Sequence, residues 1–229
     1  MLPVIFLVGS TSSGKGTLGQ RLAAEFNLHH ISLGETYRAL DRARRKPIPS
    51  MPHEINTYLV SQKEIPETVL AQFKPGHIPV VLQLHNYTMR NSKRPNLSGG
   101  ILRERIAYLL SERSILPRAI IVDALRGFAP SFSGLTIHIV CPKNVARSRY
   151  LRRARSGNSN VEKFEERMLK YEVFMPRFLN MLKSEGVVVE TVNDDTMTID
   201  EAYRVLLKHL DEVPLWRAII EMSPPATGS

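Results

Sequence analysis

The sequence has a single cysteine, Cys141, among its 229 residues. One cysteine excludes an intramolecular disulfide framework and a cysteine-based metal cluster. Because Cys141 closes the apolar run LTIHIVC, we expect a buried, unreactive thiol and a reducing, cytoplasmic location. No apolar run approaches the roughly 20 residues that a membrane-spanning helix needs. The apolar start MLPVIFLVG lacks a basic segment and leads into a glycine-rich loop, which favours a buried strand over a signal peptide.

Acidic side chains are outnumbered, with 22 Asp and Glu against 31 Lys and Arg, which leaves a net charge of +9. This surplus indicates anionic partners but does not choose among nucleotides, nucleic acids and acidic proteins. Five of the nine residues in 38–46 are basic, and so are five of the nine in 147–155. Two separate clusters suit a site for several phosphate groups better than nucleic acid, which favours one continuous basic face. We therefore expect neither a membrane nor a nucleic acid as partner, and RNA binding through these clusters is an alternative.

Five short runs, four of them apolar with several β-branched residues, alternate with helical patterns. The runs are 4–8, 29–33, 119–124, 135–140 and 186–192. This alternation predicts an α/β fold with a parallel sheet covered by helices on both faces.

Helical patterns are predicted over 53–62, 67–73 and 101–111, whereas 41–53 and 91–100 are predicted loops and 78–84 fits a strand or a helix. A long helical pattern starts at Val161, and Pro176 is expected to bend it or end it early. Thr198 and Glu201 form a capping box that opens a further helix. Trp216 is expected to pack a short last segment onto the domain.

The segment GSTSSGKGT, Gly9 to Thr17, matches G-x-x-x-x-G-K-[ST] with one extra glycine before the threonine. Its glycines let the backbone turn tightly and direct N–H groups toward phosphates, and the helix that follows directs its positive end at the same anion. Lys15 adds a charge, and a hydroxyl is available to Mg²⁺. The predicted ATP-phosphate site consists of Gly9, Ser12, Ser13, Gly14, Lys15, Gly16 and Thr17.

This loop, followed by LGQRLAAEF and HHISLGETYR, resembles the adenylate kinase family of nucleoside monophosphate kinases. In that family the pattern S-x-G-[DE]-x-x-R binds the acceptor, and its arginine holds the acceptor phosphate. SQKEIPETVLAQF is similar to the segment that closes over the acceptor base, and GHIPVVLQL from Gly76 is a second candidate for that role. The resemblance implies an acceptor site made of Ser32, Leu33, Gly34, Arg38, Glu64, Ile65, Arg126 and Arg155.

IIVDALRG is similar to the family strand that ends in D-G-[FY]-P-R, so the resemblance implies that Asp123 holds Mg²⁺ through water, together with Thr17. The chain from LTIHIVCP onward is similar to the family's lid, long helix, last strand and last helix. By that match Arg153 and Arg155 flank a short lid. The implied catalytic residues are Lys15, Arg126, Arg153 and Arg167.

The resemblance implies a three-layer P-loop kinase fold with a parallel five-stranded sheet, an acceptor-binding insertion at about 32–100 and a short lid at about 153–160. We expect one domain over 1–221, a disordered tail over 222–229, and a monomer. The implied reaction moves the γ-phosphoryl group of ATP–Mg²⁺ to a nucleoside monophosphate, with AMP as the expected acceptor and UMP and CMP as alternatives.

Four departures from the family pattern affect the acceptor side. Leu33 replaces a threonine, D-A-L-R replaces D-G-F-P-R, the adenine-reading glutamine is absent, and Asn158 and Ser159 replace the lid's acidic pair. Two other functions are therefore kept. One is a degenerate nucleotide-binding or regulatory protein with weak activity, and the other is a related P-loop kinase of a small molecule.

Overall fold

A computed structural model describes residues 2–45, 47–72, 80–91, 97–112, 117–123, 133–153 and 160–222. The chain divides into two compact units, which we call the sheet unit (Met1–Ser32 and Ile115–Ser229) and the helical unit (Leu33–Ser114). Among the described residues, no helix combines the length and the apolar character that crossing a membrane requires.

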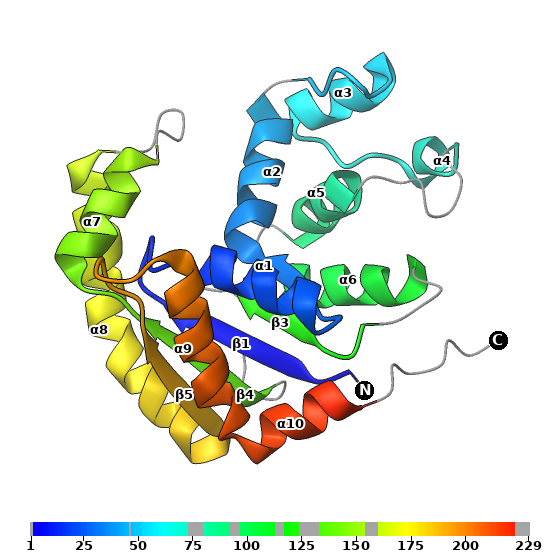
Figure 1. Ribbon diagram of the computed structural model, residues 1–229. Helices are drawn as coiled ribbons and strands as arrows, with labels where there is room; N and C mark the ends of the chain where they lie inside the picture. Colours follow the sequence, from blue (N-terminus) through cyan, green and yellow to red (C-terminus); the bar gives the residue numbers. More distant parts are fainter. Residues whose placement is uncertain are drawn as a thin grey trace. The chain divides into compact units, whose positions relative to one another are not determined.

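The sheet unit contains a five-stranded parallel sheet in the order β2-β3-β1-β4-β5 (Figure 1). The strands are β1 (Val4–Gly9), β2 (His29–Ser32), β3 (Ile120–Asp123), β4 (Ser133–Val140) and β5 (Val187–Val192). All five predicted strands are present, and the predicted α/β class with a parallel sheet is confirmed. Every residue of β1, the central strand, is buried, which explains its continuous apolar sequence VIFLVG.

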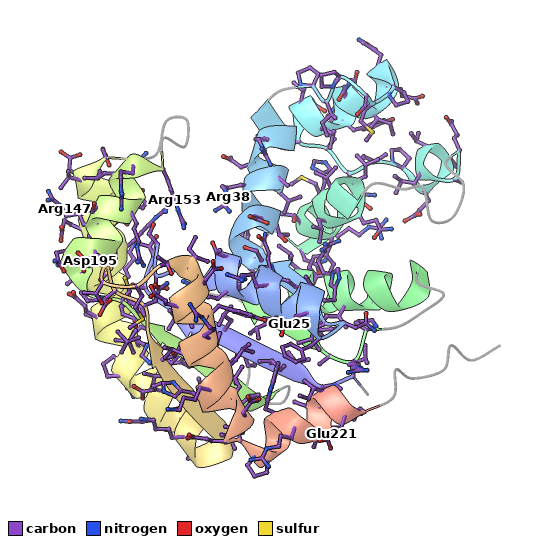
Figure 2. The ribbon with its side chains drawn as sticks, in the orientation of Figure 1. Glu25, Arg38, Arg147, Arg153, Asp195 and Glu221 are labelled. Carbon is purple, nitrogen blue, oxygen red and sulfur yellow. The ribbon has the colours of Figure 1, made fainter. Side chains whose placement is uncertain are left out.

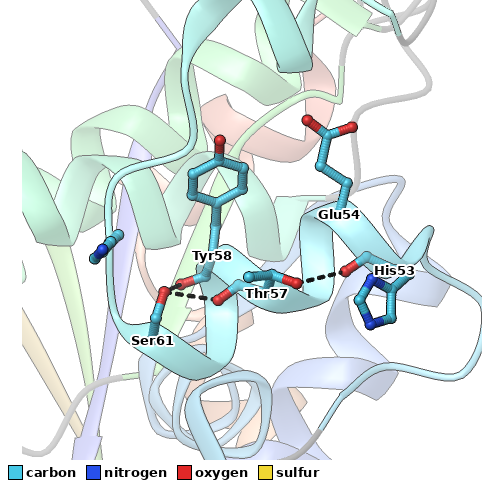
Figure 3. Close-up of a pocket in the computed structure, with 6 residues that line it drawn as sticks. His53, Glu54, Thr57, Tyr58 and Ser61 are labelled. Carbon is cyan, nitrogen blue, oxygen red and sulfur yellow. Dashed lines mark hydrogen bonds between the residues drawn. The ribbon is translucent and has the colours of Figure 1, made fainter.

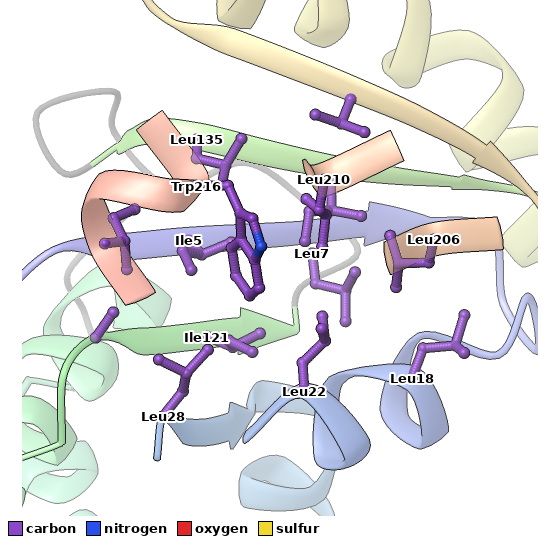
Figure 4. Close-up of a cluster of buried hydrophobic side chains, with 14 of the residues drawn as sticks. Ile5, Leu7, Leu18, Leu22, Leu28, Ile121, Leu135, Leu206, Leu210 and Trp216 are labelled. Carbon is purple, nitrogen blue, oxygen red and sulfur yellow. The ribbon is translucent and has the colours of Figure 1, made fainter. Parts of the chain in front are cut away.

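One face of this sheet is covered by α1 (Lys15–Glu25), α9 (Ile199–Asp211) and α10 (Pro214–Glu221). Leu22 of α1 and Leu206 of α9 are fully buried against the inward-facing strand residues (Figure 4). Trp216 of α10 is also fully buried, and its ring meets Phe26 edge-on at 5.0 Å between centroids. The predicted packing of the last segment through Trp216 is thus confirmed, as is the capping box of Thr198 and Glu201 at the start of α9.

On the other face, α7 (Lys143–Arg152) packs against α8 (Val161–Glu185), which contacts β4 and β5. The expectation that Pro176 ends this helix early is wrong, because α8 continues for nine residues beyond it. Proline at 176 removes the hydrogen bond to the carbonyl of Glu172. Both residues are exposed, so water can bind that carbonyl. The buried side chains of Met175, Phe178 and Leu182 keep the helix on the sheet.

The helical unit contains α2 (Leu33–Arg45), α3 (His53–Ser61), α4 (Glu67–Leu70), α5 (Val80–Asn91) and α6 (Leu97–Glu112). Its core includes Ile55, Leu59, Ile65 and Leu82. The stretch 78–84, which fitted a strand or a helix, is helical from residue 80. The predicted loops were too long, since α2 continues to residue 45 and α6 starts at residue 97, and the predicted helix over 67–73 ends at Leu70. Tertiary packing outweighs the loop-forming composition where α2 and α6 are longer than predicted.

A buried histidine lies between the sheet and α8. His138 Nε2 of β4 is hydrogen bonded with the Tyr171 hydroxyl at 2.8 Å, and its Nδ1 lies 3.8 Å from Glu190 Oε2. Burial lowers the pKa of His138 from its ordinary 6.5; Glu190 opposes this shift, whereas Lys183 and Lys15 add to it. Burial also raises the pKa of Tyr171 to about 12, so the hydroxyl stays protonated near neutral pH.

We predict that His138 makes the folded protein sensitive to mild acid. Well above pH 6.5 the ring is neutral in both the folded and the unfolded chain. As the pH falls below that ordinary pKa, the unfolded chain takes up a proton that the folded protein resists, so the free energy of unfolding falls by up to about 1.4 kcal/mol per pH unit. Urea unfolding from about pH 7.5 to about pH 5 should show a shallower fall in the His138→Gln variant.

The control for this experiment is His53→Gln, which changes an exposed histidine and should keep the wild-type slope. The lowered pKa of Glu190 reduces stability only as the pH falls below its ordinary 4.5, outside this window. Equal slopes for His138→Gln and the wild type would contradict the prediction.

Candidate phosphate-binding site

The loop from Gly9 to Thr17 curls around the side chain of its own lysine. Lys15 Nζ donates hydrogen bonds to the carbonyls of Gly9 at 3.0 Å and Ser10 at 2.7 Å, and it lies 3.5 Å from Ser13 Oγ. Only 8% of Lys15 is exposed, and burial lowers its pKa although Asp123 opposes the shift. Main-chain carbonyls thus replace the water around a buried ammonium group, which would otherwise be costly to bury.

Two glycines permit this curl. Gly9 has φ 152° and Gly14 has φ 98°, in the region that favours glycine. A Cβ on Gly9 would lie 2.5 Å from the carbonyl oxygen of Ile139. A Cβ on Gly14 would lie 2.2 Å from Asn193 Nδ2. The loop therefore requires glycine at both positions, because the φ angles are unfavourable for other residues and because a Cβ would collide with neighbouring atoms.

Asp123 lies beside the loop at the carboxyl end of β3. The strand register places it next to Leu7 on one side and Ser32 on the other. Its Oδ2 would be 3.7 Å from a Cβ built on Gly16, and its charge acts on Lys15. The carboxyl ends of parallel strands thus bring together groups distant in the sequence, as expected for a switch point of an open α/β sheet.

The donors near this loop fit one metal ion in particular. Among the described residues, no group of three or more His, Cys, Asp or Glu side chains could hold a metal. The loop itself offers the hydroxyl of Thr17, and the end of β3 beside it offers the carboxylate of Asp123. Mg²⁺ keeps several waters and is typically bound by one or two carboxylates plus substrate phosphates, so this sparse donor set fits it.

A pocket of about 360 Å³ adjoins the loop. It lies within the sheet unit, and its walls combine apolar side chains with three arginines. The lining residues are Gly14, Thr17, Leu18, Arg149, Arg152, Arg153, Asn193, Met197, Ile199 and Ala202. Sequence reasoning missed the part contributed by residues 193–202. The available signal was their position directly after β5, where the loops of a parallel sheet gather.

Arg149 and Asn193 hold the outside of the loop. Asn193 Nδ2 donates to the carbonyl of Ser13 at 2.8 Å, and Arg149 donates to the carbonyl and the side-chain oxygen of Asn193. Arg149 is half-buried, whereas Arg147 and Arg152 of the same helix are exposed. Cys141 is also half-buried near it, and burial raises the pKa of the thiol, in agreement with an unreactive cysteine.

The predicted catalytic arginines have different positions. Arg153 is close enough for its charge to lower the pKa of Lys15, and it lies on the C-terminal side of α7 (Figure 2). Arg167 of α8 lies over the ring of Tyr150, with 5.6 Å from Cζ to the ring centroid. Arg126 and Arg155 lie outside the described residues, as do Asn158 and Ser159 of the predicted lid. The roles of all four arginines stay predictions.

The predicted acceptor residues are divided between the two units. Ser32 ends β2 in the sheet unit, whereas Leu33, Gly34 and Arg38 are on α2 in the helical unit. Leu33 is buried, and Arg38 is exposed with Nη2 3.9 Å from Glu35 Oε1. An exposed guanidinium one turn into α2, the helix that directly follows Ser32, is compatible with the predicted contact to a phosphate.

The predicted base-closing segment is fixed inside the helical unit by α5. Asn86 accepts from the Ile65 amide at 2.8 Å and donates to the Ile65 carbonyl at 2.9 Å. Arg90 forms an ion pair with Glu64. Ile65 is fully buried in the core, so its side chain supports the segment. The second candidate, from Gly76, lies outside the described residues until α5 begins.

A second pocket, of about 380 Å³, lies along α3 in the helical unit (Figure 3). It is lined by His53, Glu54, Thr57, Tyr58, Ser61 and Lys63. The hydroxyls of Thr57 and Ser61 donate to carbonyls of the same helix. With the hydroxyls of Thr57 and Ser61 bonded within the helix, this pocket lacks the glycine-rich turn and buried lysine of the loop.

Comparisons with known proteins give short and distant matches. No protein-family model matches the chain. An adenylate kinase of Rickettsia bellii is 31% identical over 67 residues, which is 29% of this chain and 30% of that protein. A cytidylate kinase of Nitrobacter winogradskyi is 48% identical over 40 residues, which is 18% of this chain and 19% of that protein. The matches therefore span less than a third of the curated relatives.

Among solved structures, TT1252 from Thermus thermophilus is 17% identical and covers 92% of this chain and 97% of its own, with a TM-score of 0.48. The fold itself is an α/β, P-loop-like fold with an all-parallel sheet. The partial matches to adenylate and cytidylate kinases support a relation to nucleoside monophosphate kinases and do not determine an acceptor.

We predict that Gly14→Ala destabilises the protein strongly, whereas Gly16→Ala does not. At Gly14 an alanine meets both an unfavourable φ and Asn193 Nδ2, and the combination should cost at least about 2 kcal/mol. At Gly16 the nearest atom would be Asp123 Oδ2 at 3.7 Å, an ordinary contact. Urea unfolding of the two variants tests this difference, and equal free energies of unfolding would contradict it.

Proposed function

We propose that this protein transfers the γ-phosphoryl group of ATP–Mg²⁺ to a nucleoside monophosphate. One observation carries the proposal: a lysine whose ammonium is buried inside a glycine-rich loop, between the carboxyl end of β1 and the start of α1. A loop of this kind directs amide groups, a helix N-terminus and a lysine at the same phosphates. The partial similarity to adenylate and cytidylate kinases supports the same class of reaction.

On the donor side, the loop residues from Gly9 to Thr17 bind the β- and γ-phosphates, and Lys15 places its charge across them. Asp123, through water, and Thr17 would hold Mg²⁺, which neutralises charge on the phosphate oxygens when bound. The pocket next to Gly14 and Thr17 is the place for the base and ribose of ATP. Its apolar wall, which includes Met197 and Ile199, suits a flat aromatic ring.

On the acceptor side, the attacking phosphate is already ionised, so the reaction needs no general base. Catalysis then depends on in-line positioning and on cations around the transferred group. Lys15, Arg126, Arg153 and Arg167 supply these cations, and Arg38 and Arg155 hold the acceptor. Arginine suits this work because it can bind two phosphate oxygens at once. Ser32, Leu33, Gly34, Glu64 and Ile65 complete the acceptor site.

The acceptor assay separates this proposal from a nucleotide-binding protein without activity. The protein is incubated with ATP, Mg²⁺ and each of AMP, CMP, UMP and GMP, and diphosphate formation is measured. AMP and CMP come first because the partial matches are to kinases of these two nucleotides. Lys15→Met should reduce product formation about a hundredfold or more, because it removes the cation aligned with the transferred group.

The matched control is Lys143→Met, the same change at an exposed lysine that pairs with Glu165. It should retain wild-type activity. Background product with all four acceptors would overturn the kinase proposal, and a thermal shift with ATP but with none of the monophosphates would favour a binding protein.

A second prediction concerns the pocket beside the loop. Ile199→Ser removes part of the apolar wall, so ATP should bind about threefold to tenfold more weakly. Inorganic tripolyphosphate, which has no base, should bind as it does to the wild type. Calorimetric titration measures both affinities, with Leu169→Ser, an exposed position on α8, as the control. If Ile199→Ser lowered the affinities for ATP and tripolyphosphate by the same factor, the pocket would not be the site of the base.

A further inference from the structure

The phosphate loop is supported from outside by a chain of hydrogen bonds that begins on α7 and passes through the turn after β5. Arg149 and Asn193 form this chain, and Ser13 is the loop residue it reaches. Figure 2 shows the two elements side by side, marked by Arg147 on α7, by Arg153 directly after that helix and by Asp195 in the turn. We call the pair Arg149–Asn193 the strut.

The guanidinium of Arg149 is shared among acceptors of one turn. Nη1 donates to the Asn193 carbonyl at 3.1 Å, and Nη2 donates to Asn193 Oδ1 at 3.3 Å and to the carbonyl of Asp194. Such use of a planar, forked donor fixes the turn in one position. The carboxylate of Asp194 also accepts from the amide and hydroxyl of Thr196, which stiffens the turn further.

Arg149 also determines which end of the Asn193 amide faces the loop. Because Oδ1 accepts from Arg149, Nδ2 is left to donate to the Ser13 carbonyl at 2.8 Å. Asn193 is 8% exposed, and its own main-chain N–H donates to the Val140 carbonyl at 2.8 Å. The donor that reaches the loop is therefore buried and held at both its backbone and its side chain.

The contact with Ser13 has a consequence for the next amide. In a trans peptide the C=O and N–H bonds point in opposite directions, and no cis peptide occurs among the described residues. A Ser13 carbonyl held toward Asn193 thus turns the N–H of Gly14 away from Asn193. A Cβ on Gly14 would lie 2.2 Å from Asn193 Nδ2 and collide with it. The contact between Asn193 and the loop therefore requires glycine at position 14.

We propose that Arg149 and Asn193 are positioning residues that orient the Ser13–Gly14 peptide so that its N–H binds the phosphates of the donor nucleotide. This inference rests on the proposed function for the identity of the donor, ATP. The strut therefore raises the affinity for the donor nucleotide and leaves the affinity for the acceptor unchanged. Loss of either member leaves the peptide free to rotate, and the N–H must then be ordered when the phosphates bind.

The test is the binding of ATP and of inorganic tripolyphosphate to the full chain without acceptor. Asn193→Ala, which changes no charge, should weaken both ligands about fivefold to tenfold, the worth of one oriented hydrogen bond. Arg149→Lys keeps the charge but loses the fork, and it should weaken both ligands to a similar extent. The double variant should bind both ligands no more weakly than the single variant with the lower affinity, because both residues act through one contact.

The control for the helix is Arg147→Lys, a charge-conserving change at an exposed position of α7, which should bind as the wild type does. Circular dichroism and urea unfolding show whether each variant is folded at the assay temperature, and the KM of the acceptor should not change. Wild-type affinity for tripolyphosphate in Asn193→Ala would overturn the proposal. So would wild-type affinity in Arg149→Lys, since only the charge of Arg149 would then matter.

The two proposals fail in different ways. If the wild type binds ATP but phosphorylates none of the four acceptors, the kinase proposal fails. The affinities of the variants for ATP and tripolyphosphate still test the positioning role of Arg149 and Asn193. If the variants bind ATP as the wild type does while phosphoryl transfer is observed, the strut fails and the kinase proposal stands.

Discussion

The ammonium of Lys15 sits inside the turn of its own loop, on two carbonyls that are five and six residues away along the chain. A charged group with so little exposure must be surrounded by acceptors, and the backbone supplies them only if it curls. This curl demands positive φ values at Gly9, Ser12 and Gly14. It also demands a rigid base, which the buried central strand β1 provides. The sheet, the helix α1 and the glycine pattern all serve this one arrangement.

The same loop is restrained by two separate sets of hydrogen bonds. Lys15 draws carbonyls inward at Gly9 and Ser10, whereas Asn193 draws the Ser13 carbonyl outward. Peptide groups whose carbonyls are already engaged have their N–H groups oriented before a ligand arrives. Preorganisation of this kind reduces the free energy spent on ordering the loop during binding. The proposed phosphate site is thus a property of three separate segments of the chain, and the motif from Gly9 to Thr17 is only the most visible of them.

The parts that could be predicted from sequence are those with a local signal. The strands follow from short β-branched runs, the loop from its glycines and lysine, and the start of α9 from Thr198 and Glu201, three residues apart. The strut could not be predicted, because Arg149 and Asn193 are 44 residues apart and neither position has a distinctive local pattern. Of the two alternatives at Pro176, an early end of α8 is wrong, because the carbonyl left without its partner is on an exposed residue and the buried side chains beyond it keep the helix on the sheet. Composition marks 41–53 and 91–100 as loops, yet α2 continues to residue 45 and α6 starts at residue 97.

The hydrogen bond between Asn193 and Ser13 joins residues that are 180 positions apart. During synthesis the phosphate loop therefore leaves the ribosome long before the residue that holds its outer side exists. At usual translation rates of about 5 to 20 residues per second, this interval lasts roughly 10 to 40 seconds. Strand β4, which flanks β1 in the sheet, is also made late, so the nascent N-terminal segment cannot complete its site alone. The proposed donor site therefore gains the hydrogen bond that supports its outer side only after residue 193 has been made.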